Sequence, residues 1–274
     1  MSITAPPAPP PPSAAPGTSR TITTLWRIGG ALVVVPMLVY GVYQVVIALA
    51  HEEQTLRRSF DAAGITTLEV HNQAGGSVQV VGADIDTIRV RARVSHGLRR
   101  TGHSERVEGD RVVLASSCPL YGTDFCSVSY TVEVPSDIDL LLRTDSGRVG
   151  ATDIDGTVDI GNDTGSIELV QVTGDINVHT DTGRIDASGL TGAQADASTD
   201  TGRVHLDFDV APQAVQASTD TGSVEVVLPD DTATYRVETG TDTGGEVVSV
   251  RTDPSSTRSI VARTDTGDIT IRYR

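Results

Sequence analysis

The sequence contains no lysine: apart from histidine, all 21 of its basic residues are arginine. Aspartate and glutamate number 36, which gives a formal net charge of −15. A chain this acidic repels the phosphate backbone of DNA and RNA, so we expect no nucleic-acid partner. The negative charge is concentrated in residues 143–274, where 23 acidic and 10 arginine side chains give a net of −13.

Aromatic residues are also scarce, at 4% of the chain. A core without them must be packed by valine, isoleucine, leucine and alanine. Glycine, in contrast, occurs 27 times. Many glycines, threonines and aspartates with few aromatics favour short strands joined by closely spaced turns.

Seven of the 13 prolines lie in residues 5–16. A run of this kind cannot pack a core, and it predicts a disordered cytoplasmic tail over residues 1–24. A docking peptide for a proline-recognising domain is the alternative.

The only long apolar run is the 22-residue segment Ile28–Leu49, which carries no charge. About 20 such residues can span a bilayer as a helix, so residues 25–50 are predicted to be a transmembrane helix that contacts the lipid bilayer. Residues 51–64 would then be a juxtamembrane linker. The short tail and the two cysteines favour a single-pass cell-membrane protein, with its N-terminus cytoplasmic and its C-terminal domain extracytoplasmic. Cleavage of the anchor after Ala50 stays open.

Cys118 and Cys126 are the only cysteines, and seven residues separate them. This spacing does not match a CxxC redox or zinc motif. In an oxidising compartment, two cysteines that bracket a loop containing proline and glycine favour a local disulfide. Two free thiols are the alternative.

A four-residue phrase recurs from Thr144 onward, in the form Thr-Asp-Thr-Gly or close to it. Its glycines are Gly147, Gly165, Gly183, Gly202, Gly222, Gly244 and Gly267, at intervals of 18, 18, 19, 20, 22 and 23 residues. A period near twenty is typical of solenoids.

Polar and apolar residues alternate within each period, as in Ser166–Leu169 and Asp175–Val178. Alternation of this kind predicts strands with one buried face. We therefore expect an all-β fold, a parallel β-helix-like solenoid with coils of about 20 residues over residues 143–274. Residues 65–142 are predicted to be an irregular β segment that forms the first, wider coils. Its expected strands are Thr67–His71, Ser77–Val81, Thr87–Ser95, Arg111–Ser116 and Ser127–Val134.

The recurring phrase has two interpretations. Aspartate can cap backbone amides and glycine can adopt a positive φ, so the phrase is explained as a turn. Stacking would also align seven aspartates that could bind cations as a ladder. These weak metal candidates are Asp145, Asp163, Asp181, Asp200, Asp220, Asp242 and Asp265. The turn interpretation is preferred, no cofactor is expected, and a regular repeat along one edge does not match the paired triplets of aspartic proteases.

The only basic region begins in the strand Thr87–Val94, whose alternation places three arginines on one face. Arg99, Arg100, Arg106 and Arg111 extend it. A solvated strand face is the simple interpretation, and contact with anionic lipid head groups or an acidic partner is the alternative.

The phrase Val132–Pro135, followed by Leu140–Gly147 and the repeated Thr-x-Thr-Gly turns, resembles a bacterial family of domains of unknown function named "putative adhesin". The resemblance covers residues 65–274. It implies a β-helix-like solenoid, which is often attached to a membrane helix, and it brings no catalytic or binding residues.

Three functions are compatible with these features. The first is a structural, adhesin-like or interaction module for an envelope protein or surface polymer, with no catalysis expected. The second is an envelope-sensing regulatory partner. The third is a polysaccharide-acting enzyme that would use paired carboxylates such as Asp207 and Asp209, since parallel β-helices can carry such sites.

Overall fold

The computed structural model describes residues 33–43, 45, 52–96, 100–119 and 126–274. The chain divides into two compact units, Met1–Leu49 and Ala50–Arg274. The predicted proline-rich tail and the cleavage position after Ala50 lie outside the described residues.

The described part of the first unit is a helix over residues 33–43, with residue 45 also helical. Within the described residues, no helix is long and apolar enough to cross a membrane. The predicted single-pass localisation, which placed a membrane helix at residues 25–50, is therefore wrong.

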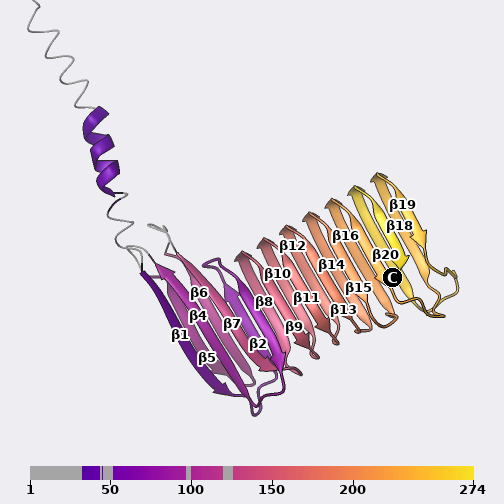
Figure 1. Cartoon of the computed structure of the whole chain (residues 1–274), viewed down its shortest axis with the longest axis horizontal. Helices are drawn as coiled ribbons and strands as arrows, with labels where there is room; N and C mark the ends of the chain where they lie inside the picture. The colour runs from indigo at the N-terminus through magenta and orange to yellow at the C-terminus, as the bar shows by residue number, and fades with distance from the viewer. Residues whose placement is uncertain (1–32, 44, 46–51, 97–99, 120–125) are drawn as a thin grey trace, which may run out of the picture. The chain divides into compact units, whose positions relative to one another are not determined.

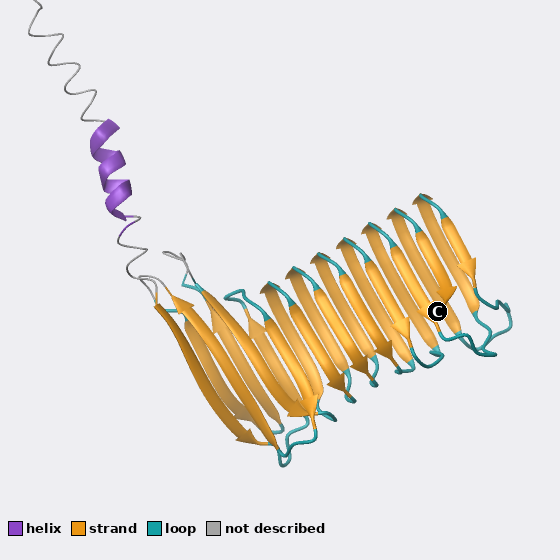
Figure 2. Cartoon of the chain, in the orientation of Figure 1, coloured by secondary structure: helices purple, strands orange, loops and turns teal. Residues whose placement is uncertain are grey.

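The second unit is built from strands, which confirms the all-β prediction for this part of the chain (Figure 2). The strands of the first half are β1 (Glu52–Asp61), β2 (Thr67–Asn72), β3 (Val78–Ala83), β4 (Thr87–His96), β5 (Gly102–Glu108), β6 (Arg111–Ser117), β7 (Ser127–Pro135), β8 (Asp139–Ser146), β9 (Val149–Ile154), β10 (Val158–Thr164) and β11 (Ile167–Val172). Those of the second half are β12 (Ile176–Thr182), β13 (Ile185–Leu190), β14 (Gln194–Thr201), β15 (Val204–Phe208), β16 (Ala214–Thr221), β17 (Val224–Leu228), β18 (Arg236–Thr243), β19 (Glu246–Ser249), β20 (Ser259–Thr266) and β21 (Ile269–Tyr273).

These strands form two sheets, here called sheet A and sheet B. Sheet A has 11 strands in the order β1-β4-β7-β3-β9-β11-β13-β15-β17-β21-β19. Sheet B has 10 strands in the order β18-β20-β16-β14-β12-β10-β8-β2-β6-β5. From β8 onward, each Thr-Asp-Thr-Gly turn joins one strand of sheet B to the next strand of sheet A. We call each such pair of strands a rung.

Neighbouring rungs pair in parallel and in register. Val158 of β10 lies opposite Leu140 of β8 on one side and Ile176 of β12 on the other. In sheet A, Ile167 of β11 lies opposite Val149 and Ile185 in the same way. Because side chains alternate between faces, these registers bring the apolar positions of every rung to one side of each sheet. All six of these side chains are buried, and together with their equivalents they form one continuous core.

The segment before the repeat follows a different plan. Its predicted strands nearly coincide with β2, β3, β4, β6 and β7. β2 and β3 pair in parallel with β8 and β9, and β6 and β7 pair in parallel outside them, as coils would. β4, β5 and β1 depart from a coil, because each pairs antiparallel with its neighbour. The prediction of coils alone therefore misses the antiparallel strands.

The predicted linker over residues 51–64 is also corrected. Glu52–Asp61 is strand β1, which pairs along its whole length with β4. Nearly all of its residues are exposed, so its sequence carries no alternation of buried and exposed residues that would predict a strand.

Order in space departs from order in sequence where the repeat ends. The rung β20/β21 lies between β16/β17 and β18/β19, although it follows both in the chain (Figure 1). The chain therefore skips one rung position, builds the outermost rung and returns to fill the gap.

Candidate functional site

The Thr-Asp-Thr-Gly edge is held by its first threonine. Thr180, Thr199, Thr219 and Thr264 are buried, although threonine is a polar residue. Each donates its hydroxyl to the carbonyl oxygen of the glycine in the neighbouring turn, at 3.1–3.3 Å. These hydrogen bonds give each buried threonine hydroxyl a partner in the neighbouring turn.

The glycine of the phrase is needed for close stacking. A β-carbon on Gly183 would lie 1.8 Å from the carbonyl oxygen of Gly165, and one on Gly202 would lie 1.7 Å from that of Gly183. At Gly165, the φ of 140° also lies in a region that residues with a side chain rarely adopt. The packing of one turn on the next therefore explains the first threonine and the glycine of the phrase.

The aspartates of the phrase face solvent, whereas its first threonine is buried. Asp145, Asp163, Asp181, Asp200, Asp220, Asp242 and Asp265 are all exposed. Across the part of the chain that the structure describes, no group of three or more histidine, cysteine or acidic side chains is arranged to hold a metal ion. The line of aspartates gives a negative edge, and the skipped rung places Asp265 between Asp220 and Asp242 in that line.

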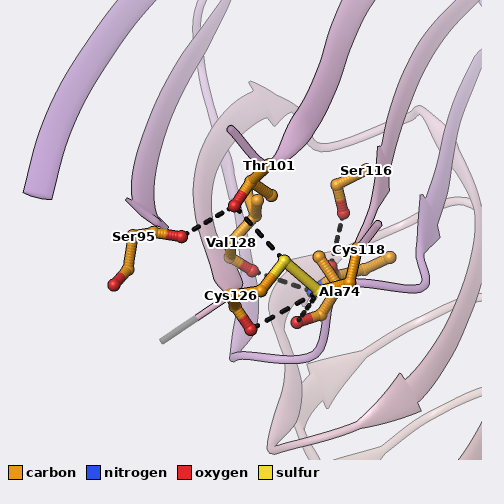
Figure 3. The surroundings of a disulfide bond; sticks show 8 residues. Ala74, Ser95, Thr101, Ser116, Cys118, Cys126 and Val128 are labelled. Atoms are coloured by element: carbon orange, nitrogen blue, oxygen red, sulfur yellow. Dashed lines mark hydrogen bonds between the residues drawn. A yellow bond between two sulfur atoms is a disulfide. The ribbon is translucent and has the colours of Figure 1, made fainter. Parts of the chain in front are cut away.

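Cys118 and Cys126 are joined by a disulfide with a Cα–Cα distance of 5.9 Å (Figure 3). The bridge ties the residue after β6 in sheet B to the residue before β7 in sheet A. The hydroxyl of Thr101 lies 3.3 Å from the sulfur of Cys126 and donates to the carbonyl oxygen of Ser95 at 2.8 Å. The disulfide thus links the two sheets near strands β4 and β5.

A hollow of about 640 Å³ lies on the outer face of sheet B. It crosses β10, β12, β14, β16 and β20. A row of in-register polar residues lines it: Asp159, Asn177, Asp196 and Gln216, each on a different strand. We call these four residues the polar row.

Three members of the polar row have unused hydrogen-bonding groups. The side chains of Asn177, Asp196 and Gln216 form no hydrogen bond or ion pair with any described residue. Asp159 differs, because the guanidinium of Arg143 lies 2.8 Å from its carboxylate. Partial burial without a compensating cation raises the pKa of Asp196 above its usual range.

The carboxylates that could serve a catalytic site already form ion pairs with arginines. One guanidinium nitrogen of Arg274 lies 2.7 Å from Asp207 and 2.6 Å from Asp209. Asp230 is paired with Arg251 at 3.2 Å. Asp207 and Asp209 flank the buried Phe208, so the alternation of side chains directs both away from the core. Their shared contact with Arg274, which follows β21, links β21 to β15 across β17.

Sequence reasoning missed a buried polar cluster between the two sheets. His103 contacts the hydroxyl of Tyr130 at 3.0 Å and the carboxylate of Glu105 at 2.9 Å. The side chain of Glu105 is only 2% exposed, and Arg58 lies 3.3 Å from its second oxygen. Burial raises the pKa of Tyr130 well above its usual range, so the phenol stays protonated. His103 and Glu105 lie on β5 of sheet B, which pairs with β6, and Tyr130 lies on β7 of sheet A. No local sequence motif indicates that these residues meet.

A scan against protein-family models and a search of curated proteins found no match. Solved structures resemble the chain at low identity. A putative cell adhesion protein from Clostridium sporogenes shares 11% identity and a TM-score of 0.38, covering 81% of this chain and 100% of that one. A putative adhesin from Bacteroides fragilis shares 14% and 0.44, covering 81% and 97%. A putative adhesin from Parabacteroides distasonis shares 13% and 0.28, again covering 81% and 97%.

Proposed function

We propose that the chain is a β-solenoid interaction module of adhesin-like role, which binds an extended polar polymer in the hollow of sheet B. The polymer class that we propose is a polysaccharide. The observation that carries this proposal is the polar row, in which Asn177, Asp196 and Gln216 offer hydrogen-bonding groups that no described residue uses.

The dimensions of the hollow favour a polymer over a compact ligand. It crosses five strands, and neighbouring strands are about 4.8 Å apart, so it extends roughly 19 Å along the stack. The carboxylate and amides of the polar row accept and donate hydrogen bonds, which suits hydroxyl-rich sugars. A polar side chain stands at this position on four of the five strands, and Val261 stands there on β20, so a chain of repeating units can be contacted at successive strands.

The ion pairs that the carboxylates form favour a binding role over catalysis. Asp207 and Asp209 both accept a hydrogen bond from the guanidinium of Arg274, so both carboxylates are already engaged in an ion pair within the chain. Within the polar row, Asp159 and Asp196 are separated by β12, and Asp159 is already paired with Arg143.

The proposal is tested with the full chain on a panel of neutral, acidic and amino-sugar polysaccharides, by calorimetry or co-sedimentation. Replacing Asn177 and Gln216 together by leucine removes the free amides. Each lost hydrogen bond weakens binding by ~1 kcal/mol, so affinity should fall at least about tenfold. Thr152→Leu, an equivalent polar change on the outer face of sheet A, should leave affinity unchanged.

Two results would contradict the proposal. One is the absence of saturable binding to any polysaccharide in the panel. The other is release of shortened products from a bound polysaccharide, which would establish catalysis instead.

A further inference from the structure

The outer face of sheet A carries the basic strand that the sequence singles out. In β4, Ile88, Val90, Ala92 and Val94 are buried in the core. Arg89, Arg91 and Arg93 therefore point outward, and all three are exposed. Arg99 lies outside the described residues.

Strand β1 adds a fourth arginine to this face. In the antiparallel register of β1 and β4, Arg57 lies directly opposite Arg91, and Ser59 lies opposite Arg89. On the other side of β4, Thr131 of β7 lies opposite Arg91. Like charges directly opposite each other on neighbouring strands repel, so this arrangement needs an explanation.

The four arginines are not equivalent. Arg89 is paired with Glu133 at 3.0 Å, and Arg93 is paired with Glu53 at 3.3 Å. Arg57 and Arg91 lie between them, and no carboxylate of the described residues is within ion-pair distance of either. In a chain with a net charge of −15, two facing arginines are thus left without a counter-charge.

A hollow of about 160 Å³ lies at this place. Its outward-facing lining consists of Arg57, Ser59, Arg89, Arg91, Thr131 and Glu133. The volume is that of about five water molecules, which suits one small anion with part of its hydration shell.

The chemistry of the lining favours a tetrahedral oxyanion. A guanidinium presents a planar set of donors that can bind two oxygens of a phosphate at once. The hydroxyls of Thr131 and Ser59 lie on the same face and can donate as well. Two unpaired guanidinium groups and two hydroxyls offer more donors than the two oxygens of a single carboxylate need.

We propose that this face is a binding site for a phosphate group, held between the guanidinium groups of Arg57 and Arg91. A phosphate group neutralises both arginines and relieves their repulsion. Free phosphate and a phosphate ester carried by a larger ligand share this chemistry. The site is independent of the hollow in sheet B, which lies in the other sheet.

The test uses the full chain at constant ionic strength, with sodium chloride as the reference. Inorganic phosphate and glycerol 3-phosphate are titrated separately by calorimetry, and the midpoint of thermal unfolding is followed in parallel. We expect saturable binding of at least one probe, with a rise in the unfolding midpoint. Binding of both assigns recognition to the phosphate group alone, whereas binding of the ester only assigns the site to phosphate on a larger ligand.

The variants separate a binding site from general charge. Arg91→Gln and Arg57→Gln should each weaken phosphate binding at least tenfold. Arg93→Gln is the matched control, because it makes the same change on the same strand and face, and it should alter affinity less than twofold. Without phosphate, Arg91→Gln should leave the unfolding midpoint unchanged or raise it, because the repulsion from Arg57 is gone.

Two outcomes would overturn the proposal. The first is that neither probe binds beyond the effect of chloride at equal ionic strength. The second is that Arg93→Gln weakens binding as much as Arg91→Gln does, since that result would reflect net charge and not a site.

Discussion

The two ends of the strand stack close in different ways. The N-terminal end is built from the antiparallel strands β1, β4 and β5, is cross-linked by the disulfide and contains the buried cluster of His103, Glu105 and Tyr130. The C-terminal end, formed by β18 and β19, is a single rung with one side open. In β19, Val247 and Val248 are exposed, and the strand has only four residues.

The difference shows two solutions to one problem. An open strand edge is a template for pairing with another chain, and proteins protect it by covering it or by blunting it. At the N-terminal end, β1 and β5 each have a neighbour on one side only, and charged residues such as Glu53 and Arg57 protect the edge of β1. The C-terminal end is blunted by a short edge strand and by Glu246, which stands at the position that Ile269 fills in the next rung. Glu246 accepts hydrogen bonds from the hydroxyl of Thr239 and the amide of Thr241.

The largest expected effect comes from a glycine with a rung on both sides. In Gly202→Ala, the new β-carbon would lie 1.7 Å from the carbonyl oxygen of Gly183, so the rungs must separate. We expect the free energy of unfolding to fall by about 3 kcal/mol or more. For a domain of this size, the midpoint of thermal unfolding should fall by roughly 6–12 °C.

Gly240→Ala makes the same change in β18 at the open C-terminal end, at a position outside the turn phrase. No atom lies within 4 Å of the position that its β-carbon would take. Its free energy of unfolding should therefore change by less than about 0.5 kcal/mol. Equal losses in the two variants would show that stacking contacts do not explain the glycines.

The disulfide gives the second largest effect and belongs to the N-terminal end alone. Replacing Cys118 and Cys126 by serine opens a loop with a sequence separation of 8. The chain-entropy model assigns such a loop on the order of 2–3 kcal/mol. Chemical denaturation should show this loss in the double variant and in the reduced wild-type chain, and reduction should leave the double variant unaffected. Two titratable thiols in the unreduced native protein would contradict the bridge.

The smallest effect is expected from replacing Glu246, which protects the strand edge at the C-terminal end. Glu246→Val exposes an apolar edge and leaves the amide of Thr241 without its acceptor, which costs about 1 kcal/mol. Sedimentation velocity should then show concentration-dependent self-association.

Glu238→Val makes the same change in charge on the outward face of β18, and this variant should stay as monomeric as the wild type. If both variants associate equally, net charge and not the inward carboxylate protects the edge.

Much of this architecture can be predicted from the sequence, because the repeat brings the same chemistry to the same place every 18–23 residues. The alternation in Ser166–Leu169 requires one buried face, and the turn glycines fix where each strand ends. The polar row can also be predicted from the sequence, because the spacing of Asp159, Asn177 and Asp196 is close to that of the turn glycines.

Other features depend on contacts between distant segments. The exposed, charged sequence of β1 fits a linker as well as a strand, and only its pairing with β4 decides between them. The order of the rungs at the C-terminal end cannot be predicted from the sequence either. β18 and β20 both end in Thr-Asp-Thr, so the sequence alone would allow either of them to pair with β16. The cluster of His103 and Tyr130 joins residues 27 positions apart on different sheets.

The skipped rung imposes an order on synthesis and assembly. While a ribosome is making the chain, β18 and β19 emerge before the strands that will lie beneath them. The outermost rung therefore cannot reach its native position until β20 and β21 have been translated and inserted against β16 and β17. A chain interrupted between Ser249 and Ser259 would lack the strands that cover β16 and β17 in the complete stack. The stack can therefore be completed only after β21 has been translated. A truncated product would differ from the complete chain in the surface that it leaves exposed.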